Sequence, residues 1–320
     1  MYSFIFPGQG SQSVGMGSFL YSNFKTAKLA FEEASEAIKL DLKKLCFEGS
    51  EQDLALTENT QPAILTASVA TSRVLTQDLH INPKIMAGHS IGEYAALVTA
   101  NSLSLSDAAK AVRIRGQAMQ AAVPVGKGGM AAVLGLSDEM VTKLCAFVEM
   151  KSGLTPLSAA NFNCPGQVVI SGNVKAIAWL KTEFKAEEFF TDGTKKVKLI
   201  PLQVSAPFHC AMMKPAEEKM RNVLSDIKFN SANVNIVQNY DAQIHTDANE
   251  LRENLIKQVT APVLWTQSMQ IFLKNGHTQC IESGAGKVLQ GLLKKIDSEA
   301  FKVFNMNSLE DIKIIEDLLK

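Results

Sequence analysis

A serine lies between two glycines in the pentapeptide Gly-His-Ser-Ile-Gly at positions 88–92. The preceding run, Lys84–Ala87, is short and apolar like a buried strand, and Ile91–Ala100 after it has the spacing of a helix. This is the context of a nucleophile elbow, in which a sharp strand-to-helix turn projects the serine hydroxyl out of the fold. The first amides of the helix would face an oxyanion formed beside Ser90. The alternative is a serine that only caps the helix.

A serine hydroxyl needs a base, and the chain has five histidines. His89 adjoins Ser90, so its side chain should point away at so tight a turn. His80 and His277 lie at predicted helix ends, and His245 lies in a polar loop. His209 lies just after an apolar run and just before a predicted helix, where α/β folds gather site residues. Spacing alone is equally compatible with a buried structural histidine at this position.

Two glycine-rich loops resemble nucleotide-binding motifs but lack required residues. The loop at 8–13 follows the first predicted strand, yet Ser13 stands where a dinucleotide fingerprint has its third glycine. No acidic residue ends a following strand about 20 residues later, as that fingerprint requires. The loop at 284–288 lacks both the upstream glycine and the hydroxyl residue after the lysine of a phosphate-binding loop. We therefore expect no nucleotide cofactor.

Short apolar runs alternate with longer stretches of helical period, which predicts an α/β fold. The strands expected in its larger part are Tyr2–Phe6, Lys84–Ala87 and Thr278–Ile281. We expect Pro62 at the first position of its helix, where proline is well tolerated. The expected helices are Lys25–Phe47, Pro62–Leu79, Ile91–Ala100, Asp107–Ala122, Ala211–Ser225, Ala248–Gln258, Lys287–Ile296 and Ser308–Leu319.

The rhythm of the chain changes from Met130 onward. The order β-α-β-β-α-β follows, which is typical of a ferredoxin-like unit. Its expected elements are Met130–Leu134, Asp138–Met150, Pro156–Asn161, Gln167–Ser171, Val174–Glu187 and Lys196–Pro201. We predict a small ferredoxin-like domain at 128–202. It would be inserted into a large hydrolase-like α/β domain with a mainly parallel sheet, formed by 1–127 and 203–320.

The overall composition excludes several functions. Basic and acidic residues number 32 each, and this neutrality argues against nucleic acid as a partner. The five cysteines have no C-x-x-C spacing, so we expect reduced thiols and no metal site. The N-terminal segment does not resemble a signal peptide, and no run of eighteen apolar residues occurs. We expect a cytoplasmic monomer that contacts no membrane.

Six short motifs occur in order along the chain. They are Phe-Pro-Gly-Gln-Gly-Ser-Gln at 6–12, Thr-Gln-Pro-Ala-Ile at 60–64, Gly-His-Ser-Ile-Gly-Glu-Tyr-Ala-Ala-Leu at 88–97, Arg-Ile-Arg-Gly at 113–116, Ala-Pro-Phe-His at 206–209 and Gly-Lys-Val-Leu at 286–289. Together they resemble the malonyl-CoA:acyl carrier protein transacylases of bacterial fatty acid synthesis, essentially from end to end. One departure is Ala285, where relatives often carry proline.

The resemblance implies a ping-pong reaction. Ser90 would attack the malonyl thioester of coenzyme A, and His209 would take its proton. The backbone amides of Gln9 and Ile91 would bind the oxyanion. Gln258 would orient the histidine, so that a Ser–His dyad operates without a carboxylate. The malonyl-Ser90 ester would then pass to the thiol of holo acyl carrier protein, with coenzyme A as part of a substrate and no resident cofactor.

The resemblance also implies how the substrates are selected. Arg115 would bind the malonyl carboxylate through two parallel hydrogen bonds; without the resemblance, an arginine on this predicted helix would be assigned to a solvated face. Phe208 would crowd an α-methyl branch and so favour malonyl over methylmalonyl. Acyl carrier proteins are acidic, so some surface lysines are candidate docking residues, although ordinary solvated lysines explain them equally well. These are Lys195, Lys196, Lys198 and Lys214.

Three alternatives stay open on the sequence. A serine hydrolase would normally have an acidic third member and no use for an arginine that binds a carboxylate. A non-catalytic binding module would form no covalent adduct. A transferase of the same chemistry could load the carrier of a polyketide or polyunsaturated lipid synthase instead.

Overall fold

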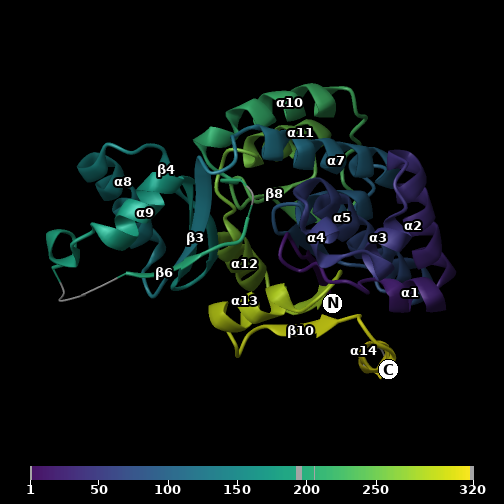
Figure 1. The fold of residues 1–320 in the computed structure, drawn as a ribbon. Coiled ribbons are helices and arrows are strands. Elements are labelled where there is room, and N and C mark those ends of the chain that lie inside the picture. Colours follow the sequence, from purple (N-terminus) through teal and green to yellow (C-terminus); the bar gives the residue numbers. More distant parts are fainter. Residues whose placement is uncertain (1, 192–196, 205, 318–320) are drawn as a thin grey trace.

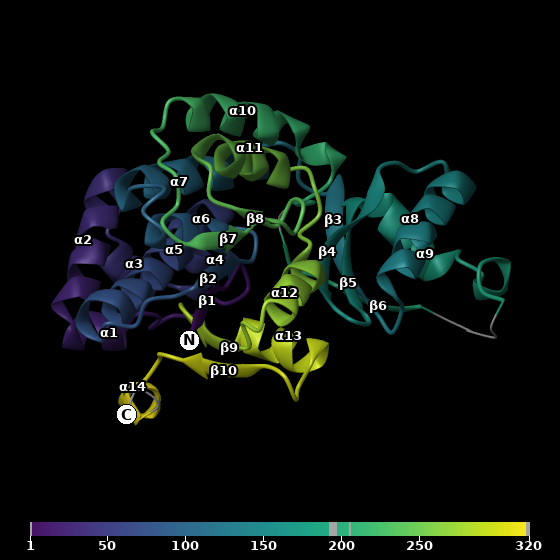
Figure 2. The same ribbon diagram turned by 180° about the vertical axis from the view of Figure 1, so that it is seen from behind.

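The larger sheet runs through the larger unit of the fold shown in Figure 1, and its strands are labelled in the opposite view of Figure 2. In this computed structural model, which describes residues 2–191, 197–204 and 206–317, its strands are β1 (Ser3–Phe6), β2 (Ile85–Gly88), β7 (Asn235–Val237), β8 (Ile244–His245), β9 (Gln279–Glu282) and β10 (Lys302–Asn305). They lie in the order β10-β9-β1-β2-β7-β8. All neighbours are parallel except β7 and β8, so the predicted mainly parallel sheet is confirmed.

Helices cover both faces of this sheet because alternate residues of its buried strands face opposite sides. Phe4 and Phe6 of β1 belong to one hydrophobic core, and Ile5 belongs to the other. The first core is built from α1 (Ser18–Asn23), α2 (Lys25–Ile38), α3 (Leu42–Glu48), α4 (Glu51–Ala55), α5 (Thr57–Arg73), α6 (Gly92–Thr99), α7 (Leu105–Ala121), α10 (Lys214–Ser225), α11 (Ala248–Gln258) and α14 (Leu309–Asp317). The second is built from α12 (Trp265–Lys274) and α13 (Val288–Ile296) (Figure 2).

A second, antiparallel sheet lies to one side of the first (Figures 1 and 2). Its elements are β3 (Gly128–Leu134), α8 (Asp138–Ser152), β4 (Leu157–Cys164), β5 (Gln167–Asn173), α9 (Val174–Thr182) and β6 (Lys198–Pro201). The strand order β4-β5-β3-β6 confirms the predicted ferredoxin-like unit. Ala131 and Val133 pack against α8 and α9, whereas Met130 and Ala132 join the core of the larger unit. The exact domain limits at 127/128 and 202/203 stay a prediction.

The two units are joined by main-chain hydrogen bonds as well as by packing. Phe162 in β4 donates its amide hydrogen to the carbonyl of Val263, with 3.0 Å between nitrogen and oxygen. Val263 donates in turn to the carbonyl of Ala160 at 2.8 Å. This contact holds β4 against the segment that leads into α12, so residues from both units can line one cavity.

Several predicted helices begin or end at other residues; the helix expected at Val174–Glu187, for example, ends at Thr182. The single helix expected at Lys25–Phe47 is broken at Lys39, which has a left-handed φ of 51°. Pro62 does not open its helix, because α5 begins at Thr57 and the proline lies inside it. Proline cannot donate to the carbonyl four residues earlier. That carbonyl, of Glu58, accepts a hydrogen bond from Nη1 of Arg113 at 2.9 Å instead.

Some elements were not predicted at all. They are α1, α4, α12, β7, β8 and β10. Other helical turns replace the ends of predicted helices: a π-helical turn at Val74–Asp78 and the 3₁₀ turns Ala186–Glu188 and Ala211–Met213. The five cysteines are buried and free. Among the helices of the described residues, none combines the length and apolar character needed to cross a membrane.

The glycines of the elbow permit a close approach that a side chain would prevent. A Cβ atom on Gly92 would lie 2.2 Å from the carbonyl oxygen of Phe6, and one on Gly88 would lie 2.0 Å from the carbonyl carbon of Gly92. We expect Gly92→Ala to lower the free energy of unfolding by about 1–3 kcal/mol, measured by urea denaturation. Gly291 in α13 is the matched control, because a Cβ there meets nothing within 4 Å. Gly291→Ala should stabilise the protein by up to about 1 kcal/mol, and equal effects of both substitutions would contradict the prediction.

Candidate active site

The elbow and His209 meet in the structure. Strand β2 ends at Gly88 and α6 begins at Gly92, so the turn between them is short. Ser90 has a left-handed φ of 51°, a conformation that non-glycine residues adopt rarely and mainly at constrained sites. Its Oγ lies 2.8 Å from Nε2 of His209. The serine hydroxyl and the imidazole are therefore within hydrogen-bonding distance.

The other ring nitrogen of His209 determines its tautomer. Nδ1 lies 2.9 Å from the main-chain oxygen of Gln258 and 3.2 Å from that of Ala261. Carbonyl oxygens only accept, so the proton sits on Nδ1 and the Nε2 lone pair is free for the Ser90 hydroxyl. Burial, and secondarily the charge of Arg115, lower the pKa of His209 to about 3. The imidazole is thus neutral, as a base must be.

Gln258 contacts the histidine through its main chain rather than its side chain. Its side-chain amide serves other partners: Oε1 accepts from Nη2 of Arg115 at 3.0 Å, and Nε2 donates to the main-chain oxygen of Ser90 at 3.2 Å. Gln258 therefore touches every member of the cluster formed by Ser90, His209 and Arg115.

Arg115 is buried rather than solvated, with 1% of its surface exposed. Its Nη1 donates to Oε1 of Gln61 at 3.0 Å, and its Nη2 also donates to Oγ of Ser90 at 3.2 Å. Among the described residues, no acidic side chain forms an ion pair with it. A buried charge is normally paired, because transferring a charged group from water into the protein costs several kcal/mol. Removing the partner of a buried charge destabilises a protein by about 3–5 kcal/mol. The hydrogen-bond partners of Arg115 among the described residues are all neutral oxygens.

A cavity of about 100 Å³ opens beside Ser90 and His209. Both units contribute to its wall, and so do the predicted residues Gln9, Ile91 and Phe208. The lining side chains are those of Gln9, Gln61, His89, Ser90, Ile91, Arg115, Met119, Met130, Asn161, Leu202, Val204, Phe208 and His209. The structure thus brings together every site residue predicted from the sequence; Gln258 does not line the cavity but contacts Ser90, His209 and Arg115.

The remaining histidines and the candidate docking lysines either lie outside this cluster or bind other side chains. His89 lines the cavity, but its Nε2 is bonded to Oδ1 of Asn163 at 2.8 Å. Lys195 and Lys196 lie outside the described residues. Lys198 is exposed on β6, and Lys214 forms an ion pair with Glu217 at 2.7 Å.

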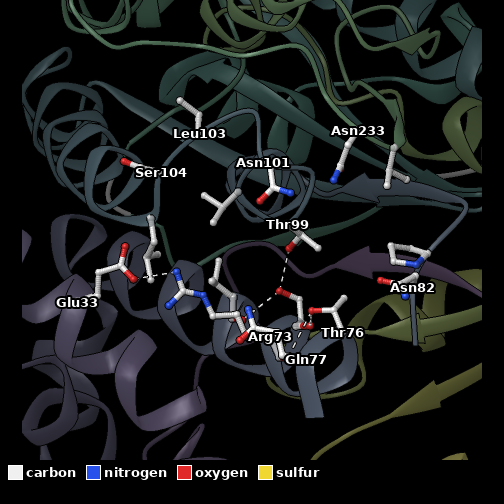
Figure 3. A pocket seen from close by; sticks show the side chains of 16 residues that line it. Glu33, Arg73, Thr76, Gln77, Asn82, Thr99, Asn101, Leu103, Ser104 and Asn233 are labelled. Carbon is white, nitrogen blue, oxygen red and sulfur yellow. Dashed lines mark hydrogen bonds and ion pairs between the residues drawn. The ribbon is translucent and has the colours of Figure 1, made fainter. Parts of the chain in front are cut away.

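A larger cavity of about 440 Å³ shares no lining residue with this site. Some of its polar groups pair with one another: Arg73 forms an ion pair with Glu33 at 2.8 Å, and Thr99 donates to Oγ of Ser72 at 2.8 Å (Figure 3). No histidine occurs among its lining residues in the described part of the chain, and the carboxylate that lines it, Glu33, forms an ion pair with Arg73.

Three buried polar residues of the site were not predicted as functional. Gln61 accepts from Arg115, Asn239 accepts from the main-chain amide of Ser90, and Glu93 accepts from the main-chain amide of Asn239. Gln61 and Glu93 each lie within one of the six motifs, and this was the only feature of the sequence that could have indicated a role for them. Asn239 follows the unpredicted strand β7, and no motif includes it.

Comparison with known proteins agrees with this geometry. The chain matches the acyl transferase domain family over residues 3–304. It is 42% identical to the malonyl CoA-acyl carrier protein transacylase of Bacillus subtilis strain 168, over 99% of this chain and 97% of the relative. The chain belongs to the malonyl-CoA–acyl carrier protein transacylase family.

Solved structures of the family have the same fold as this transacylase. The acyl carrier protein S-malonyltransferase of Vibrio cholerae is 40% identical, with a TM-score of 0.90 over 98% of this chain and 99% of that one. A malonyl-transacylase in complex with a holo acyl carrier protein of a type II polyketide synthase is 38% identical, with a TM-score of 0.90 over 99% of both chains.

Proposed function

We propose that this transacylase transfers a malonyl group from malonyl-CoA to the phosphopantetheine thiol of holo acyl carrier protein in the cytoplasm, for fatty acid biosynthesis. The observation that carries the proposal is the buried Arg115 guanidinium, which has neutral hydrogen-bond partners and lies 3.2 Å from the nucleophilic oxygen. An acyl group that ends in a carboxylate can pair with this guanidinium through two parallel hydrogen bonds.

The first half-reaction forms an ester on Ser90. Nε2 of His209 takes the hydroxyl proton as Oγ attacks the thioester carbonyl. The amides of Gln9 and Ile91 donate to the resulting oxyanion. Collapse of this intermediate breaks the carbon–sulfur bond, and the coenzyme A sulfur leaves with the proton from His209.

The second half-reaction reverses the first with a new thiol. His209 takes the proton of the phosphopantetheine thiol, the sulfur attacks the malonyl ester, and Ser90 recovers its proton. Both steps need a histidine that exchanges one proton, and two backbone carbonyls orient it for this. Among the described residues no carboxylate bonds to His209, which separates the site from the Ser-His-Asp arrangement of most hydrolases.

Initial rates with both substrates varied test the proposal. A ping-pong transferase gives parallel double-reciprocal lines, and malonate release without carrier protein stays far slower than transfer. Intersecting lines, or malonate release at the rate of transfer, would contradict it. Rates with fatty acid and polyketide carriers compare the two acceptors, because a 38% identical relative is in complex with a polyketide carrier.

The pH profile gives a second test of the dyad. His209 must be neutral to act, and its pKa near 3 lies well below the ordinary 6.5. Protonation should therefore not slow malonylation between about pH 8 and about pH 5, whereas an ordinary histidine would lose most of its activity there. In Arg115→Ala the acid limb of the pH–rate profile should move to higher pH, toward the ordinary pKa of histidine, because the positive charge of Arg115 no longer lowers the pKa of His209. An acid limb near 6.5 in kcat/KM of the unmodified enzyme would contradict the lowered pKa of His209.

We also propose that 128–202 act as the inserted domain and that the chain works as a monomer. The support is that one chain supplies the whole cavity wall, with Met130, Asn161 and Leu202 from the smaller unit.

A further inference from the structure

The main chain at the elbow is bonded by side chains from outside the elbow. The amide hydrogen of Ser90 is donated to Oδ1 of Asn239 at 2.7 Å. Nδ2 of the same asparagine donates to the carbonyl oxygen of Gly88 at 2.7 Å. One amide group thus bridges the residue where β2 ends and the residue with the left-handed φ, supplying both a donor and an acceptor.

Asn239 is itself held by the helix that follows the elbow. Its main-chain amide donates to Oε2 of Glu93 at 2.7 Å, and Nε2 of Gln238 donates to Oε1 of the same carboxyl at 2.9 Å. Glu93, Gln238 and Asn239 are fully buried. A closed ring of hydrogen bonds therefore links the elbow to the loop after β7. Glu93 on α6 binds the main chain of Asn239, and the Asn239 side chain binds the main chain of Ser90.

This ring has a direct consequence for the reaction. A serine with φ of 51° stays in that conformation only where the surroundings enforce it, since such strain costs on the order of 1–3 kcal/mol. If the elbow relaxed, Oγ would move away from Nε2 of His209, and a misplacement of about 1 Å can reduce a rate about 100-fold.

We propose that Asn239 is a positioning residue that holds Ser90 in its reactive conformation, and that Glu93 acts through Asn239. The proposal rests on the proposed role of Ser90 as nucleophile. Only an amide fits both bonds: an aspartate would turn an oxygen toward the carbonyl of Gly88, and an alanine would leave both main-chain groups unpartnered.

Glu282 offers a matched comparison for the buried carboxylate. Like Glu93, it is fully buried, and burial raises the pKa of both to about 7. It accepts main-chain hydrogens of Leu289 and Gln290 at 2.9 Å each, at the start of α13. It therefore stabilises the fold in the same way as Glu93 but does not contact the elbow through any of these bonds.

The test is the single-turnover rate of malonylation at saturating malonyl-CoA, followed by intact-protein mass spectrometry, alongside urea denaturation. Asn239→Ala should react about 100-fold more slowly than the unmodified enzyme with little change in KM. Glu93→Gln should also be slowed, and the double variant should be no slower than Asn239→Ala, because both act on one element. Glu282→Gln should lose stability but keep the unmodified rate.

Asn239→Asp keeps the acceptor for Ser90 and should retain an intermediate rate; it also serves as the test if Asn239→Ala does not fold. The proposal is overturned if the Asn239 variants lose stability as Glu282→Gln does but react at the unmodified rate. It is also overturned if the rate of the double variant is reduced by the product of the reductions measured for Glu93→Gln and Asn239→Ala. Failure of the unmodified enzyme to become malonylated would instead overturn the proposed function.

Discussion

Ser90→Ala is expected to form no malonyl adduct and to reduce malonyl transfer by a factor of about 10⁴ or more. The reason is geometric: Oγ lies 2.8 Å from the base and 3.2 Å from Arg115, and no other atom occupies that position. The main chain of the elbow is bonded to Asn239 through the amide of residue 90, which alanine retains, so the fold should persist. Transfer is measured as malonyl carrier protein formed per unit time.

The matched control for this substitution is Ser298→Ala, which removes a hydroxyl from the exposed surface. It should leave both the adduct and the rate unchanged. An adduct of normal yield on Ser90→Ala would show that another residue carries the acyl group, and the assignment of the nucleophile would be wrong.

Arg115→Ala is expected to reduce the preference for malonyl-CoA over acetyl-CoA by about 10–150-fold, the equivalent of one charged hydrogen-bonding interaction of about 1.5–3 kcal/mol. The substitution removes a buried cation whose described partners are all neutral oxygens. Because Arg115 also donates to Oγ of Ser90, some loss of rate with acetyl-CoA should accompany the change in preference. The measurement is kcat/KM for the two thioesters.

Gln61→Glu tests the charge of the site without changing its shape, because glutamine and glutamate have nearly the same volume. It places a carboxylate 3.0 Å from Nη1 of Arg115 at almost unchanged volume. The internal ion pair should compete with the malonyl carboxylate, so malonyl-CoA should react more slowly while acetyl-CoA is little affected. Gln52→Glu, exposed in α4, adds the same charge elsewhere and should change neither. Unchanged preference in both Arg115→Ala and Gln61→Glu would remove the arginine from substrate selection.

The sequence predicted the elbow well because its determinants are local. Two glycines, a serine and the change from apolar run to helical period all lie within residues 84–100, and the structure places the turn there. The ferredoxin-like unit was predicted for a similar reason: its elements follow one another locally in the order β-α-β-β-α-β, and its strand order is confirmed.

The surroundings of the elbow depend on contacts between distant segments, which local patterns do not reveal. Arg115 lies on a helix rich in polar residues, and only tertiary packing buries it, so composition assigned it to the surface. The orienting group at Gln258 is a main-chain oxygen, which any residue could supply. Strand β7 has three residues, too few to show a period, so Asn239 after it could not be placed beside Ser90.

Pro62 illustrates the same limit within a helix. Proline usually marks the start of a helix, but here a side chain from α7 satisfies the carbonyl that the proline leaves free, and α5 continues through it. The compensation comes from a residue 55 positions away, so the local rule predicted the wrong start.

The central claim is that one serine carries a malonyl group between two thiols, and intact-protein mass spectrometry in two steps tests it most directly. After malonyl-CoA is added and the excess removed, the unmodified enzyme should carry one malonyl group, absent from Ser90→Ala. Addition of holo acyl carrier protein should then return the enzyme to its original mass and increase the mass of the carrier by one malonyl group. Loss of the group as free malonate before carrier is added, or a carrier that gains nothing, would contradict the account.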